Sequence, residues 1–402
     1  MFLRRPAFRM LWLVWLTANL TMWMNDVASA WLMTSLTDSA FMIAMVQSAS
    51  TLPLFLLGLP SGALADIVDR RRYLALTQVW IGGVAIVLAA LSFSGALSAP
   101  LLLACTFLNG IGMAMRWPLF AAIVPDLVPR DDLPAALALN GIAANMARLI
   151  GPLIAGALLA SAGSAYVYLL NVALSVVALA LILRWQPAPK ISILPCERLG
   201  AAMRTGLRHV LQSPQLRIIL FRIFLFFLQA TALTALLPLV ALRLGDGGPG
   251  AFTSLLVALA AGAIFIAFNL KRLRLRASPD MMVGAGICVH AVASIGAALA
   301  PAMWLAASAV AVAGMAWIAT ANSLTVAVQL ALPDWVRARG MAIYHMAVMG
   351  GSAAGAALWG YLAAISSVQA SIAAAAALGP IVFLLTKRYG VGGNLDEDRT
   401  PG

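Results

Sequence analysis

The sequence predicts an all-α membrane protein with twelve transmembrane helices in two pseudo-symmetric six-helix bundles. Three observations support this fold class: 63% of the 402 residues are hydrophobic, only 10% are charged, and the apolar residues gather in long runs. A soluble domain carries about 25% charged residues, so this composition cannot cover a water-facing surface. Disordered and collagen-like chains are excluded because neither carries so much apolar mass.

Each of twelve apolar runs is long enough to cross a bilayer, which requires about 20 apolar residues in a helix. None shows the period-two alternation of a membrane β-strand, so helices are expected throughout. The runs cover residues 10–36, 40–64, 73–95, 99–124, 135–160, 165–184, 216–242, 250–270, 281–299, 301–331, 339–363 and 366–386.

The first run has an alternative interpretation. Arginines precede it and Ala28-Ser29-Ala30 resembles a signal-peptidase site, so it could be a cleaved signal peptide. Asn19, Asn25 and Asp26 favour a spanning helix, because such polar residues are unusual in the apolar region of a signal peptide.

The net charge of +12 is distributed in a way that predicts orientation. Of the 26 Lys and Arg residues, 22 lie in the termini and alternate loops that share one side of the membrane. Basic residues concentrate on the cytoplasmic side, so we expect an inner-membrane protein with both termini in the cytoplasm. The same placement argues against nucleic acid as a partner.

The sequence offers no sign of enzyme, metal or cofactor chemistry. Cys105, Cys196 and Cys288 are far apart and lack a CxxC or histidine neighbour at metal-ligand spacing. No P-loop, GxSxG or HExxH motif is present. We therefore predict neither catalysis nor a bound cofactor.

The longest hydrophilic stretch divides the chain into two halves. We predict an N-terminal bundle over 1–184, a cytoplasmic linker over 185–215, a C-terminal bundle over 216–388 and a cytoplasmic tail over 389–402. A weak repeat supports the division, because Pro-Asp follows both the fourth and the tenth run, 208 residues apart. Residues 196–212 fit either a basic amphipathic helix on the inner leaflet or a solvated linker helix.

The second loop carries the most informative motif. Gly62, Asp66, Arg70 and Arg71 follow one another at spacings of four, four and one. An aspartate placed so can face the positive N-terminus of a neighbouring helix, and the arginines can bridge neighbouring spans. We predict that this loop holds one conformation and acts in a conformational switch.

This loop resembles the G-x-x-x-D-x-x-x-R-R motif of the major facilitator superfamily. Asp69 stands where that family usually has glycine, as in its drug-exporter-like branch, which includes enterobactin exporters and macrolide efflux proteins. Further stretches are similar to the same branch: 52–54, 127–130, 148–152, 212–217 and 332–337. The resemblance implies two bundles around a central site, alternating access and secondary active export, commonly by proton antiport.

The resemblance also covers a helix-packing segment, but one arginine of the family pattern is absent. Gly151, Pro152 and Gly156 in the fifth run partly match the family's antiporter pattern, in which small residues let helices approach closely. The arginine that many relatives carry in the fourth span would fall near Thr106, where this chain has none.

Polar residues inside the runs are candidates for a central site, because ionisable groups at membrane depth are costly and usually face a cavity. The candidates for proton coupling or for lining the substrate cavity are Asp26, Asn19, Asn109, Arg116, Asn145, Arg148, Arg222 and Gln229. If Asp26 and the three arginines face one cavity, its charge of +2 would favour substrates with carboxylate, catecholate or phosphate groups.

Several candidates keep two interpretations. For Asp26 the interpretations are a group that binds and releases protons, a member of a static ion pair with an arginine, or a solvated residue of the outer vestibule. Arg116 and Arg148 line a cavity or make packing contacts, and Arg222 lines it or extends to the membrane surface. His290 and His345 are coupling groups or packed hydrogen-bonding residues.

Three functions remain open at this point. The first is an exporter of small amphipathic organic compounds, drug- or siderophore-like, driven by protons. The second is an uncoupled facilitator or importer on the same fold, and the third is a membrane receptor or assembly subunit that transports nothing. The expected partners are a small-molecule substrate, the lipid bilayer and protons, and the chain is expected to be a monomer.

Overall fold

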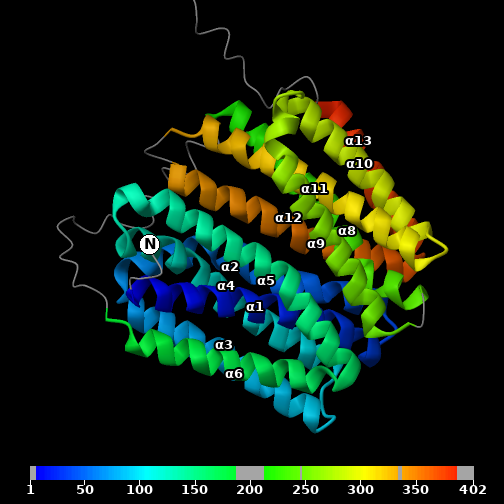
Figure 1. Ribbon diagram of the computed structural model, residues 1–402. Coiled ribbons are helices and arrows are strands. Elements are labelled where there is room, and N and C mark those ends of the chain that lie inside the picture. The colour runs from blue at the N-terminus through cyan, green and yellow to red at the C-terminus, as the bar shows by residue number, and fades with distance from the viewer. Residues whose placement is uncertain (1–5, 187–211, 245–246, 334–336, 387–402) are drawn as a thin grey trace, which may run out of the picture.

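A computed structural model describes residues 6–186, 212–244, 247–333 and 337–386 (Figure 1). All twelve predicted spans are helices, and every predicted boundary lies within four residues of the observed one. The N-terminal half holds α1 Pro6–Leu36, α2 Ala40–Ile67, α3 Arg70–Phe93, α4 Ala99–Leu127, α5 Leu133–Ser161 and α6 Ser164–Arg184. The C-terminal half holds α8 Pro214–Arg243, α9 Pro249–Arg274, α10 Pro279–Leu299, α11 Met303–Ala331, α12 Arg337–Ile365 and α13 Val368–Thr386.

Eleven of these helices are long and apolar enough to cross a membrane, counted over the described residues. The remaining long helix is α1, which carries Asn19, Thr21, Asn25 and Asp26 along its central turns. These side chains lower its mean hydropathy, although α1 is as long as its neighbours. Polar atoms concentrated in one helix of a bundle indicate that this helix borders an internal site.

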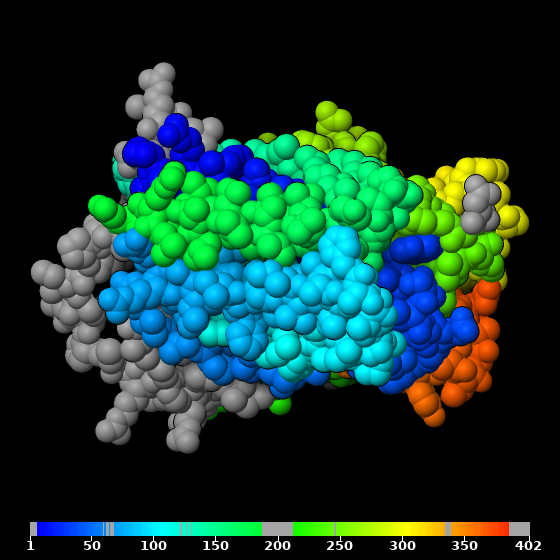
Figure 2. Space-filling model, turned by 90° about the horizontal axis from the view of Figure 1, so that it is seen from below, coloured from blue at the N-terminus to red at the C-terminus, as the bar shows by residue number. Residues whose placement is uncertain are grey.

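The chain forms two bundles of six helices, and α3 and α6 cover the face of the N-terminal half seen in Figure 2. Two helix pairs join the halves along their length: α2 packs against α12, and α5 packs against α9. In the first pair the Ser48 hydroxyl donates a hydrogen bond of 2.6 Å to the carbonyl of Ala353. The pair approaches closely because Gly360 lacks a side chain, and a β-carbon there would lie 2.5 Å from that of Ala44.

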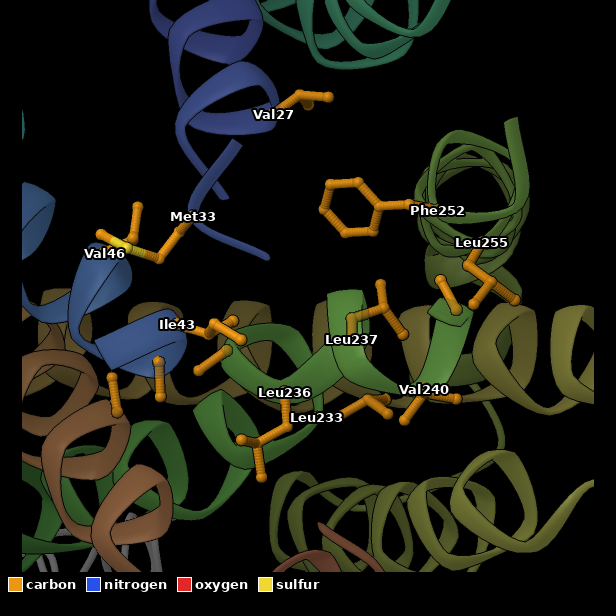
Figure 3. Packing of buried hydrophobic residues seen from close by; sticks show 14 of the residues in the cluster. Val27, Met33, Ile43, Val46, Leu233, Leu236, Leu237, Val240, Phe252 and Leu255 are labelled. Atoms are coloured by element: carbon orange, nitrogen blue, oxygen red, sulfur yellow. The ribbon is translucent and has the colours of Figure 1, made fainter. Parts of the chain in front are cut away.

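Among the described residues, the apolar core that both halves share lies at one end of the bundle. The termini end of the bundle is the end at which α1 starts and α13 ends. The opposite end is called the far end. The apolar seal is the far-end cluster drawn in Figure 3, which combines side chains of both halves: Val27, Met33, Ile43, Val46, Leu233, Leu236, Leu237, Val240, Phe252 and Leu255. Trp31 stacks on Phe252 within it, with ring centroids 5.9 Å apart.

At the termini end, the described apolar clusters are each confined to one half. One cluster joins the first half of α8 and the first turns of α10 to the last turns of α11 and the start of α12. Two others join α1 to α3, α4, α5 and α6 within the N-terminal half. The described apolar core is therefore shared across the far end, while at the termini end the halves meet through single contacts such as that of α4 with α12.

The contact of α5 with α9 yields a stability prediction. A β-carbon at Gly156 would lie 2.0 Å from Thr253 Oγ1 and 2.7 Å from its Cβ. We expect Gly156→Val to destabilise the purified protein by about 1–3 kcal/mol, the usual cost of overpacking a tight contact. Adding Thr253→Gly should restore the thermal transition. A single variant as stable as the parent, or no rescue in the double variant, would contradict the contact.

Candidate functional site

Arg148 lies between two tryptophan rings that come from different halves. Its guanidinium carbon is 5.6 Å from the ring centroid of Trp23 on α1 and 4.9 Å from that of Trp317 on α11. Both distances fall within the range of a cation–π contact, about 6 Å. Within the described residues, Arg148 has no carboxylate partner and no hydrogen bond. Its N–H donors thus remain available at the contact between the halves.

The local sequence explains how Arg148 reaches this position. Gly151 lies one turn further along α5, and a β-carbon there would be 2.7 Å from Trp23 Cβ. Only a glycine permits such close packing of α5 on α1, and Pro152 is buried beside it. The predicted packing role of Gly151 and Pro152 agrees with these contacts, although it stays a prediction for the conformational cycle.

Asp26 lies on α1 one turn beyond Trp23 and is partly exposed. The structure gives this carboxylate no ion pair or hydrogen bond with any residue it describes. These contacts do not support a static ion pair with an arginine. An unpaired carboxylate in the same part of α1 as the Arg148 contact retains the freedom to bind a proton.

An aromatic chain extends from Arg148 into the C-terminal half. Trp317 contacts Phe227 with ring centroids 6.3 Å apart, Phe227 contacts Phe226, and Phe226 contacts His290. His290 is buried, and its Nδ1 lies 3.3 Å from the Ser294 hydroxyl. These contacts favour the packed interpretation of His290.

A second ring contact links the halves through His345 of α12. Its ring meets Trp117 of α4 edge to face, at a centroid distance of 5.2 Å, and also contacts Tyr344. The Tyr344 hydroxyl shares a hydrogen bond of 2.6 Å with Thr325 Oγ1 on α11. His345 therefore packs at the interface rather than inside one half.

Arg116 is held in a packing contact inside the N-terminal half. It is 3% exposed and donates to the Ala18 carbonyl at 3.2 Å and to Gln78 Oε1 at 3.3 Å. Its partners come from α1 and α3, so the guanidinium ties three helices of one half together. This favours the packing interpretation over a cavity lining.

The predicted amides are not brought together. Asn19 is buried and donates to the Trp15 carbonyl of its own helix, at 2.8 Å. Asn109 on α4 is nearly fully buried, and Asn145 on α5 is exposed. None of these three has a described contact with Arg148 or Asp26.

Arg222 and Gln229 lie within the C-terminal half. Arg222 is buried, its Nη1 lies 3.4 Å from Asp280 Oδ1, and it stacks 5.7 Å from the ring centroid of Phe383. This ion pair is not among the predicted interpretations of Arg222, which stay predictions. Gln229 lies two turns further along α8 and is also buried.

The loop motif is described in part. Asp69 Oδ1 accepts a hydrogen bond of 2.7 Å from the Arg72 N–H and caps α3, which explains an aspartate where the related motif has glycine. Arg71 donates to the Leu183 carbonyl at the end of α6, and Arg70 also has a partner. The side chain of Asp66, the surroundings of Gly62 and the segment 196–211 lie outside the described residues, so the switch stays a prediction.

The comparison with protein families decides the identity of this fold. The sequence matches the MFS_3 family, described as transmembrane secretion effector, over residues 2–399. The chain belongs to this family of the major facilitator superfamily. It is a multi-pass membrane protein, and both its family and its fold are those of transporters rather than enzymes.

One relative of this transporter is named a transporter, and two others are named an exporter and an efflux protein. The Staphyloferrin A transporter of Staphylococcus aureus is 30% identical over 139 residues, which are 34% of this chain and 35% of that protein. The enterobactin exporter EntS of Shigella boydii is 27% identical over 212 residues, 52% of this chain and 50% of its own. Macrolide efflux protein A of Streptococcus pyogenes is 25% identical over 133 residues, 33% of each chain. The matched stretches thus span a third to a half of these relatives.

Solved structures confirm the fold of the transporter. A POT family transporter in complex with 5-aminolevulinic acid superposes with a TM-score of 0.75 at 13% identity, over 95% of both chains. A bacterial homolog of the human lysosomal transporter Spinster, in an inward-facing and occupied conformation, gives 0.75 at 15% identity, over 96% of this chain and 98% of that one. The predicted two-bundle fold is therefore confirmed.

Proposed function

We propose that this transporter exports small amphipathic compounds that carry an acidic group, by proton antiport with alternating access. The observation that carries the proposal is the position of Arg148, which lies between tryptophans of both halves and has no ion pair with any residue that the structure describes. Asp26, one turn from Trp23, would be the proton carrier.

The preference for an acidic group follows from the charges left available. Arg116 is engaged in packing and Arg222 in an ion pair, so Arg148 supplies the positive charge at the contact between the halves. A guanidinium binds a carboxylate or a catecholate with two parallel hydrogen bonds. The two indole rings would then pack on the apolar part of the same molecule.

The closed far end supports an order of events. With both termini in the cytoplasm, the described conformation would load substrate from the cytoplasm while the apolar seal blocks the other side. The halves would then rock about the α2–α12 and α5–α9 contacts, the substrate would leave, and Asp26 would take up a proton. Return of the protonated form would deliver that proton to the cytoplasm.

The direction of transport rests on the relatives named above. Two of them are called an exporter and an efflux protein, which favours export over import. A placement in the bacterial plasma membrane and a monomeric state are part of the same proposal.

The experiment is a flux assay with purified protein in liposomes. The internal pH is set either equal to or different from the external pH. The probe is 2,3-dihydroxybenzoate, an aromatic carboxylate with a catechol, and its amide is the matched neutral compound. We expect an imposed pH gradient to drive accumulation of the acid but not of the amide, and an uncoupler to abolish it. Equal flux with and without the gradient would instead indicate a facilitator. No flux of any compound, together with a stable co-purifying partner, would indicate a receptor or assembly subunit.

A further inference from the structure

A small crevice lies inside the C-terminal half, away from the Arg148 contact. It is formed by α8, α10 and α13, and the space open to a water-sized sphere is about 10 Å³. A cavity of that size holds about one water molecule. Its walls are mainly apolar, with Leu225, Phe226 and Ile287 among them, and its polar lining comes from Arg222 and Gln229.

Gln229 is the unexplained group in this crevice. Its side chain is 2% exposed, and among the described residues neither its amide oxygen nor its amide nitrogen has a hydrogen-bond partner. A buried amide with no partner is rare, because it has given up its bonds to water without replacement. The amide occupies the space of a missing side chain, since a β-carbon at Gly379 would lie 1.7 Å from Gln229 Oε1.

The helix opposite Gln229 has an interrupted hydrogen-bond pattern beside the crevice. Pro380 lies within α13 directly after Gly379 and has no N–H to donate. The carbonyl of Ala376, four residues earlier, therefore lacks its usual helical partner. In membrane helices such freed carbonyls are satisfied by neighbouring side chains or by ordered water.

The crevice also has a polar approach. Arg222 lines it and lies seven residues before Gln229, which is about 10 Å along α8. Its partner Asp280 has a side chain that is 38% exposed. Polar groups thus lead from a solvent-accessible carboxylate past a buried guanidinium to the buried amide.

The N-terminal half has a related arrangement between its own first and last helices. Asn25 Nδ2 on α1 and Asn171 Oδ1 on α6 are both buried without a partner. Gly379 follows Asn171 by the 208 residues that separate the repeated Pro-Asp segments. Both halves therefore bury amide atoms without a described partner where their first and last helices meet, although the amides themselves stand at different positions.

We propose that the crevice is a water-binding site, in which water bonds to both atoms of the Gln229 amide. A small anion fits less well, because Asp280 already balances Arg222 and an anion would use only the amide N–H. This site is separate from the Arg148 contact and does not depend on the proposed transport reaction.

X-ray hydroxyl-radical footprinting of the full-length protein in lipid nanodiscs tests the proposal, because radicals formed from water oxidise the side chains beside it. Phe226 lines the crevice, whereas Phe252 lies in the apolar seal, and they are 2% and 3% exposed. We expect Phe226 to be oxidised several-fold faster than Phe252. Gln229→Leu should lower the Phe226 rate to that of Phe252.

The control variant is Thr234→Val on the same helix, whose hydroxyl bonds to its own backbone and should leave both rates unchanged. Equal oxidation of Phe226 and Phe252 in the parent protein would overturn the proposal without any variant. A Phe226 rate that falls when chloride replaces gluconate would overturn it in favour of an anion site.

Discussion

Asp26→Asn should abolish proton-driven export while the protein still inserts and folds. Asparagine keeps the size and polarity of the side chain but cannot bind and release a proton. The return step would therefore move no proton across the membrane. Because no described residue pairs with Asp26, its replacement breaks no ion pair. We expect pH-driven flux in liposomes to fall about tenfold or more, which corresponds to about 1.4 kcal/mol in the rate-limiting barrier.

The matched control is Asp38→Asn, an exposed acid in the loop that follows α1. It removes the same charge outside the helices and should leave flux unchanged. Normal pH-driven flux in Asp26→Asn would remove this residue from the mechanism. Loss of flux with a lowered thermal transition would point to a folding defect instead.

Arg148→Gln is expected to weaken recognition of the acidic group specifically. The variant loses the charge and both tryptophan contacts, each of which contributes about 0.5–2 kcal/mol. The apparent affinity for 2,3-dihydroxybenzoate should fall about tenfold, since about 1.4 kcal/mol corresponds to that factor. Any affinity for the neutral amide should change little.

Two further variants separate charge from stacking. Arg148→Lys keeps the charge but not the planar fork, so its affinity for the acid should lie between those of the parent and Arg148→Gln. Trp304→Leu on α11 removes a tryptophan that is 69% exposed and should have no effect. An equal loss of affinity for acid and amide in Arg148→Gln would contradict acid recognition and favour a packing role.

The fold was predictable because hydropathy and the distribution of arginines act locally along the chain. Each span is defined by its own apolar run, and the structure moves no boundary by more than four residues. Asp26 and Arg148 were predictable as candidates for the same reason, since ionisable residues stand out in an apolar run. The division at residues 185–215 stays a prediction, because most of that segment lies outside the described residues.

The partners of those candidates were not predictable. Arg116 and Arg148 look alike in the sequence, but Arg116 is satisfied by Ala18 and Gln78, which lie far from it along the chain. Trp317 was missed because nothing in its run distinguishes it from Trp304, which is largely exposed. Such contacts depend on helix rotation and packing, which composition and spacing do not specify.

The way in which the far end is closed has a consequence for the conditions under which the protein works. Its described contacts are apolar packing, a ring stack between Trp31 and Phe252, and nearby a neutral hydrogen bond from Ser48. Dissolved ions screen charges but have little effect on such contacts, so the closure should hold equally in dilute and in saline media. Cooling weakens apolar association, so a drop in temperature should loosen this closure more than a change in salinity.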